Sequence, residues 1–241
     1  MKYAADFRQI ARDALKGNWK IAVLAGLVAS LLGGTNAYGP KIQLDIKETG
    51  ASVDFQFFRQ TVFSTREGFP GEIAFIFILA ALLLAAVLFV LGSMVQVGHC
   101  RLHLELHDRR EASMGLLFDY VPHWKTTAVT KLLKSVYIFL WSLLLIVPGI
   151  IATYSYAMTD YILAENPELT ASEAISNSKE MMEGNRWRLF CLHLSFIGWE
   201  ILAALTLNIG NLWLRPYIMA AETAFYRDVS GAAGKERPES F

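Results

Sequence analysis

Long blocks without charged residues alternate with short charged segments along this chain of 241 residues. The hydrocarbon core of a bilayer requires about 20 apolar residues per helix, with about 17 to 25 tolerated. The blocks lack the strict alternation of a β-barrel strand, and only helices or closed barrels satisfy every backbone group in lipid. The pattern therefore predicts an all-α membrane protein with about six transmembrane helices. The predicted spans are residues 20–36, 72–98, 126–147, 150–165, 188–208 and 211–227.

The third and fourth spans belong to one hydrophobic stretch that Pro148 and Gly149 interrupt. Proline removes a backbone donor and glycine accepts left-handed angles, so this pair either kinks a single helix or forms a hairpin turn. A hairpin places 17 of the 22 lysines and arginines on one side of the membrane, whereas a kinked helix places 12 there. Because cytoplasmic segments carry an excess of these residues, the hairpin is favoured. We expect a multi-pass cell-membrane protein with both termini cytoplasmic.

Three short amphipathic segments, at residues 4–16, 113–121 and 171–183, precede odd-numbered spans. Thr170 and Glu173 add a capping box at the start of the last segment. Each segment leads to a tryptophan beside a cation, a pair that suits the headgroup boundary. These interfacial anchors are Trp19, Lys20, Trp124, Lys125, Trp187 and Arg188. The pattern predicts three hairpins, each preceded by an amphipathic helix at the cytoplasmic face; ordinary aromatic belts are the alternative explanation of the anchors.

Residues 36–71 form a sizeable loop that we predict on the extracytoplasmic side. Apolar and polar residues alternate over 42–46 and again over 53–57, which predicts a small β-hairpin. Such a hairpin is compatible with a lid, with a partner-binding element or with a solvated connector. The predicted organisation is one integral membrane domain over 1–227, which contains this loop, and a flexible cytoplasmic tail over 228–241.

Two carboxylates lie inside the last two predicted spans. At a rise of about 1.5 Å per residue, Glu200 lies about 18 Å and Glu222 about 16 Å from the start of its helix, near the middle of the bilayer. An ionised side chain there costs at least about 2.5 kcal/mol, so it usually faces a cavity or a partner. One hypothesis is a polar site for a proton or cation that contains both carboxylates and Asn208, with Arg215 at its outer mouth. Protonated or shielded carboxyl groups are the alternative.

His99, His103 and His107 share one face of a helix that leaves the second span. Two such imidazoles can chelate a transition metal. Because no cysteine or carboxylate converges on them and arginines flank them, we interpret them as cations near lipid phosphate. The sequence therefore predicts no metal site and no cofactor.

Several motifs in order resemble a known family. They are RDALKGNW at 12–19, VPGII at 147–151, LSFIGW at 194–199, PY at 216–217 and AFY at 224–226. The chain resembles a family of small bacterial integral membrane proteins of unknown function, apart from the 36–71 loop and the tail. PGI at 148–150, Glu165, AISNS at 174–178 and Gly184 are more distantly similar to the membrane domain of some glycerophosphodiester phosphodiesterases. That catalytic domain has no counterpart here, so the resemblance implies a topology and no catalytic residues.

Two functions follow from these patterns. The first is a non-enzymatic membrane component whose amphipathic helices bind membrane lipids or a partner protein. The alternative is a small ion-coupled transporter or permease that uses Glu200 and Glu222. No motif for nucleotide binding, nucleophilic catalysis or zinc hydrolysis is present, and the formal net charge of zero gives no reason to expect nucleic acid. A homo-oligomer or a membrane-protein partner is compatible with the sequence.

Overall fold

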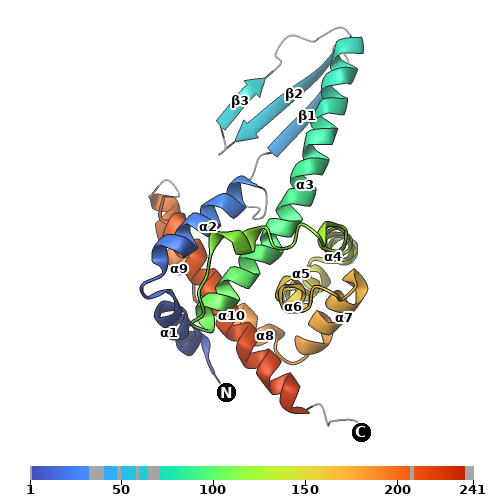
Figure 1. The fold of residues 1–241 in the computed structure, drawn as a ribbon. Coiled ribbons are helices and arrows are strands. Elements are labelled where there is room, and N and C mark those ends of the chain that lie inside the picture. The colour runs from blue at the N-terminus through green and yellow to red at the C-terminus, as the bar shows by residue number, and fades with distance from the viewer. Residues whose placement is uncertain are drawn as a thin grey trace.

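The computed structural model describes residues 2–32, 41–47, 50–57, 60–64, 71–206 and 209–236, which are mostly helical (Figure 1). The helices of the first half are α1 (Ala4–Leu15), α2 (Trp19–Leu31), α3 (Gly71–His107), the 3-10 helix η1 (Met114–Leu117) and α4 (Trp124–Leu144). Those of the second half are α5 (Ile146–Ser155), α6 (Thr159–Glu165), α7 (Ala171–Met181), α8 (Arg186–Leu194), α9 (Ile197–Leu205) and α10 (Asn211–Glu236). The strands are β1 (Lys41–Lys47), β2 (Gly50–Phe57) and β3 (Gln60–Ser64).

Three helical segments in the described part of the chain are long and apolar enough to cross a membrane. They are Ile78–His107 of α3, Trp124–Leu144 (α4) and Arg186–Leu205, which combines α8 and α9. α2 is apolar but shorter, and the predicted span over 150–165 is divided between α5 and α6. Phe139, Leu143 and Ile146 around the α4–α5 connection leave 65% or more of their surface uncovered. Such an apolar surface is suited to hydrocarbon and not to water.

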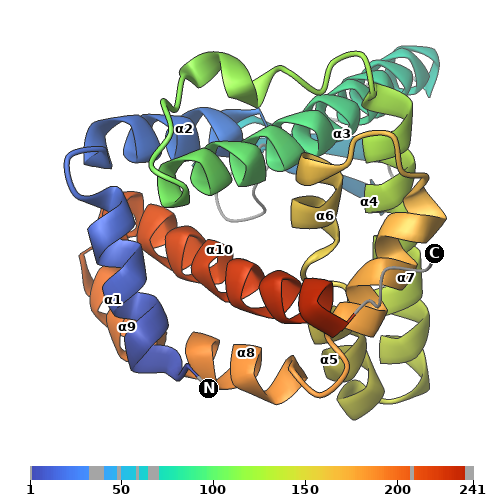
Figure 2. The same cartoon turned by 60° about the horizontal axis from the view of Figure 1, so that its bottom comes forward.

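α10 runs through the middle of the helical assembly (Figure 2). It packs against α1, α2, α3 and α9, so the end of the chain contacts its beginning. Phe7 of α1 meets Phe225 of α10 edge to face, with ring centroids 5.4 Å apart, and both side chains are fully buried. α10 continues to Glu236, whereas the sequence predicted a flexible tail from residue 228. The segment 228–236 is therefore helical, and it carries the buried side chain of Val229.

Ion pairs fix the C-terminal half of α10 to distant segments. Arg227 pairs with Asp108, just after α3, at 2.5 Å and also with Glu165 at the end of α6. Arg188 of α8 donates to Asp228 at 2.6 Å, and its guanidinium lies over the rings of Phe7 and Phe225. Arg188 is therefore held within the protein, although the sequence suggested a headgroup anchor.

Two of the predicted amphipathic segments form helices whose apolar faces are covered by protein. α1 buries Phe7, Ala11 and Leu15 and packs on α10, and α7 packs on α4 and α6. The capping box at Thr170 is formed, because its hydroxyl accepts from the Glu173 N–H and the Glu173 carboxylate accepts from the Thr170 N–H at 2.8 Å. In the region 113–121 only the short η1 is helical. A 3.6-residue period identifies an apolar face but does not say whether lipid or protein covers it.

α4 and α5 form a tight antiparallel pair. The chain reverses at Leu145, whose backbone is extended. Pro148 lies in the first turn of α5, where backbone N–H groups have no partner within the helix, so its missing N–H costs no hydrogen bond. A Cβ atom at Gly149 would lie 2.8 Å from Cα of Ser142, so glycine permits the close approach of the two helices. The hairpin turn therefore lies before Pro148 and Gly149, and these two residues belong to the helix.

The three strands form an antiparallel sheet in the order β1-β2-β3. Lys47 pairs with Gly50 at the β1–β2 turn, and the β2–β3 register shifts between Phe55 and Gln56. β2 contacts α3, and the sheet lies beside the beginning of that helix (Figure 1).

Candidate functional site

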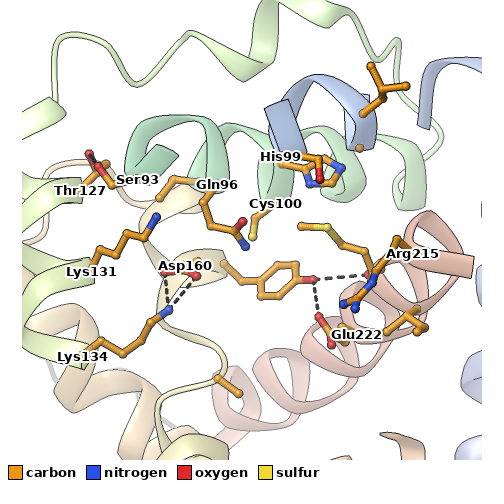
Figure 3. Close-up of a pocket in the computed structure, with 18 of the residues that line it drawn as sticks. Ser93, Gln96, His99, Cys100, Thr127, Lys131, Lys134, Asp160, Arg215 and Glu222 are labelled. Atoms are coloured by element: carbon orange, nitrogen blue, oxygen red, sulfur yellow. Dashed lines mark hydrogen bonds and ion pairs between the residues drawn. The ribbon is translucent and has the colours of Figure 1, made fainter. Parts of the chain in front are cut away.

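A cavity of about 630 Å³ lies between α2, α3, α4, α6 and α10 (Figure 3). The most buried of its lining side chains come from α3, α4 and α6. They are Ser93, Val97, His99, Cys100, Thr127 and Tyr161. The exposed lining residues mark its open side, between α2, α4 and α10. They are Leu27, Ser135, Leu212 and Arg215. The cavity therefore has a deep polar end and a mouth that contains apolar side chains.

One wall is built by α4 and α6. The Lys134 ammonium group donates to both carboxylate oxygens of Asp160, at 2.8 and 2.9 Å. Both side chains are largely buried, with 20% and 16% of their surfaces exposed. Asp160 reaches this position because the helix breaks before Thr159 and restarts as α6. Lys131, one turn earlier on α4, lies over the ring of Phe89 and completes this wall.

The opposite wall is formed by α10. The Glu222 carboxylate bonds to Nε2 of His193 on α8 at 2.8 Å and accepts from the Tyr161 hydroxyl on α6 at 3.4 Å. Arg215 lies two turns earlier on α10, at the open side of the cavity. His193 also packs against the Tyr154 ring, with centroids 5.7 Å apart. Glu222 thus connects the cavity with α6 and α8.

The floor is formed by α3, which presents Ser93, Gln96, His99 and Cys100 at helical spacing. Ser93 and Thr127 share a hydrogen bond of 3.2 Å that connects the floor to α4. Within the described residues, neither ring nitrogen of His99 nor Oε1 of Gln96 has a hydrogen-bond partner. Leaving a buried polar group unpaired costs about 1–3 kcal/mol. These atoms are therefore suited to a bound polar group.

The lining side chains carry an excess of positive charge. Lys131, Lys134 and Arg215 are cations, and Asp160 and Glu222 are carboxylates. Each carboxylate already has a basic partner, Asp160 in Lys134 and Glu222 in His193. Charge-assisted hydrogen bonds from ammonium and guanidinium groups are the strong contacts that bind phosphate and carboxylate. The cavity is suited to an anionic group.

The residues that the sequence suggested for an intramembrane site separate in the structure. Glu222 and Arg215 line the cavity, whereas Glu200 is exposed on α9 and does not line it. Asn208 lies outside the described residues. Glu200 and Glu222 therefore do not line the cavity together, because the depth estimate assumed a straight fifth span. That span breaks between α8 and α9 at the buried Phe196, and His193 of α8 becomes the partner of Glu222.

The histidines were also misinterpreted. His99 and His103 are buried with ring centroids 4.9 Å apart, so they are not cations in contact with lipid phosphate. His107 is partly exposed and bonds to Asp108 at 3.3 Å. Among the residues that the structure describes, no group of three or more His, Cys, Asp or Glu side chains is arranged to hold a metal.

The tryptophans of the suggested anchors differ in exposure. Trp187 and Trp124 leave 71% and 44% of their surfaces exposed, and Lys125 lies over the Trp124 ring at 5.7 Å. Trp19 is partly buried against the core, and Lys20 beside it is exposed. An exposed indole at a helix start is suited to a headgroup boundary.

Sequence reasoning missed several cavity residues. They are Gln96, Lys131 and Lys134, together with the role of Asp160 and the contact of His193 with Glu222. The signal was the position of Lys131 and Lys134 about one to two turns inside a predicted span, where cations are expensive and require a partner or a cavity. Their partner, Asp160, is 26 residues away from Lys134 in sequence, so no local pattern identifies it.

The fold and the cavity define a helical membrane-type protein with a polar site among its helices. The chain belongs to the family described as "Protein of unknown function (DUF975)", whose model matches residues 73–233. The match includes the floor and both walls of the cavity and leaves out α1, α2 and the sheet. It gives no support for the suggested similarity to the membrane domain of glycerophosphodiester phosphodiesterases. No curated protein and no solved structure matches the chain.

Proposed function

We propose that this protein is a non-enzymatic, multi-pass component of a cell membrane that binds the anionic headgroup of a membrane lipid in its cavity. The observation that carries the proposal is a cavity with an excess of cations inside a helical assembly whose outer surface is apolar. The sequence suggested lipid binding through amphipathic helices, but α1 and α7 pack their apolar faces on protein. The cavity is therefore the better candidate for the binding site.

The proposed topology has six crossings, made by α2, α3, α4, α5–α6, α8–α9 and α10, with both termini cytoplasmic. The distribution of lysine and arginine supports it. Lys131 then lies about 10 Å from the start of α4, and His99 about 12 Å from the end of α3, at a rise of about 1.5 Å per residue. Both belong to the cytoplasmic half of the membrane.

The form of the mouth favours a lipid over a water-soluble anion. Leu27 and Leu212 at the mouth are continuous with exposed apolar side chains on the same helices, such as Leu24 and Trp213. Acyl chains can lie against such a surface while the headgroup occupies the cavity. A soluble anion has no acyl chains, so it makes no favourable contact with these apolar side chains.

The test measures lipid binding to the purified protein by native mass spectrometry, with phosphatidylglycerol as the anionic lipid and phosphatidylcholine as the reference. Lys131→Met and Arg215→Met should each lower the affinity for phosphatidylglycerol about tenfold, since a charge-assisted contact contributes about 1.5–3 kcal/mol. Lys125→Met is the matched control, because Lys125 is exposed beside Trp124 and does not line the cavity. Equal losses in all three variants would indicate general surface attraction and refute the proposal. Soluble glycerol phosphate that binds as tightly as the lipid would exclude a lipid ligand.

A small ion-coupled transporter is the second candidate function. The observation that favours it is Glu222, which lines the cavity and bonds to both His193 and Tyr161. Glu222→Gln should then abolish pH-dependent flux in reconstituted vesicles. Glu200→Gln is the control, since Glu200 is exposed outside the cavity and its replacement should leave the flux intact. A flux that responds equally to both changes would remove this candidate.

A further inference from the structure

The cavity floor combines two kinds of unsatisfied polar group. His99 is 3% exposed, and both of its ring nitrogens lack a hydrogen-bond partner among the described residues, as does Oε1 of Gln96. Both side chains line the cavity from the same face of α3. Figure 3 shows them between Lys131 on one side and Arg215 on the other. A ligand held by these cations therefore also meets the imidazole and the amide.

The donor and acceptor properties of the His99 ring nitrogens and of the Gln96 amide indicate which ligand group can bond to both. A neutral imidazole offers one N–H donor and one acceptor nitrogen, and a carboxamide oxygen only accepts. A phosphate diester only accepts, so it can bond to the imidazole N–H but to neither acceptor. A hydroxyl group donates and accepts at once, and it therefore serves either tautomer of His99 and either end of the Gln96 amide.

An ammonium group, as in an ethanolamine headgroup, fits less well. It donates but cannot accept, so the N–H of His99 would stay unpaired. It would also add a positive charge to a cavity whose lining already has more cations than carboxylates. Like charges at short range in a site with little water repel each other strongly.

We propose that the lipid bound in the cavity has a hydroxylated headgroup, whose hydroxyl groups bond to His99 and Gln96 while its phosphate pairs with the cations of the walls. This inference rests on the proposed function, because it specifies the class of lipid that the same cavity binds. A headgroup bound at the cavity floor is removed from bulk water, so each of its polar atoms requires a partner in the protein. The floor supplies these partners.

The experiment compares two lipids with the same acyl chains and the same single negative charge. Phosphatidylglycerol has two hydroxyl groups in its headgroup, and phosphatidylethanol has none. Their affinities for the purified full-length protein are measured in competition by native mass spectrometry. We expect phosphatidylglycerol to bind about tenfold more tightly, since two neutral hydrogen bonds contribute about 0.5–1.5 kcal/mol each.

Variants assign the preference to the floor. Gln96→Leu and His99→Leu should each lower the affinity for phosphatidylglycerol about threefold to tenfold and leave that for phosphatidylethanol unchanged. His103→Leu is the control, because His103 is buried beside His99 but does not line the cavity. If His99→Leu fails to fold, Gln96→Leu provides the test alone.

The outcomes separate the two proposals. Equal binding of both lipids to the wild-type protein would overturn the hydroxyl subsite and leave the anionic lipid site in place. A preference that survives both Gln96→Leu and His99→Leu would also overturn it. Binding of neither lipid would overturn the proposed function and this inference together.

Discussion

Gly98 of α3 lies directly beneath η1, and its replacement by alanine should destabilise the protein. A Cβ atom there would lie 2.6 Å from the carbonyl oxygens of Leu116 and Leu117. Because contacts tighter than 3.4 Å are rare for a Cβ atom, η1 would have to move by about 0.8 Å. The neighbours are backbone atoms, so no side-chain rotation relieves the contact, and the Leu117 side chain is fully buried. Overpacking of this kind costs about 1–3 kcal/mol.

The higher helix propensity of alanine offsets about 0.5–1 kcal/mol of this cost. We therefore expect Gly98→Ala to lower the free energy of unfolding by about 1–2 kcal/mol. For a chain of this size the loss lowers Tm by roughly 2–8 °C. Intrinsic tryptophan fluorescence of the detergent-solubilised protein measures it on heating. Gly198→Ala in α9 is the matched control, because nothing lies within 4 Å of the added Cβ atom. A Gly98→Ala protein as stable as the Gly198→Ala protein would refute the packing of η1 on α3.

Three further predictions concern an ion pair and a helix cap. Lys134→Met should lower the free energy of unfolding by about 3 kcal/mol, because it leaves the Asp160 carboxylate largely buried and unpaired. Lys134→Met combined with Asp160→Leu should recover most of the loss in the same denaturation assay, and a double variant as unstable as the single one would contradict this. Thr170→Ala should speed amide exchange in the first turn of α7 several-fold, since the hydroxyl caps that turn. Hydrogen bonds from the Thr170 hydroxyl and N–H lower the pKa of Glu173. The stabilisation is then fully present above the ordinary carboxyl pKa of about 4.3 and is lost as pH falls through the lower folded value. The protection of the α7 amides relative to their intrinsic exchange rates should therefore fall at acid pH in the wild type but not in Glu173→Gln, and equal pH profiles of protection would exclude the cap.

The sequence was sufficient for the features that depend on local chemistry. The apolar block over 72–98 lies within α3, and the block over 126–147 overlaps α4. The capping box at Thr170 starts α7 as predicted, because its hydrogen bonds join residues only three positions apart. Length and composition also suffice to identify helices that can cross a membrane.

The cavity depends on contacts between distant segments, and sequence patterns did not reveal it. Glu222 was identified as an intramembrane charge, but its partner His193 belongs to another helix. The break at Phe196 within the fifth predicted span changes which side chain faces α10, and Gly198 just after it did not by itself predict a break. The closed packing of α1 was missed for a similar reason, since an apolar face is equally compatible with lipid and with protein.

The central position of α10 has a consequence for biogenesis. A ribosome delivers α10 after α1 to α9, so Asp108 and Glu165 exist on the nascent chain before Arg227 is available to neutralise them. One wall of the cavity, with Glu222 and Arg215, is likewise missing until α10 inserts. Any ligand that contacts both walls can therefore bind only after α10 has packed against the other helices.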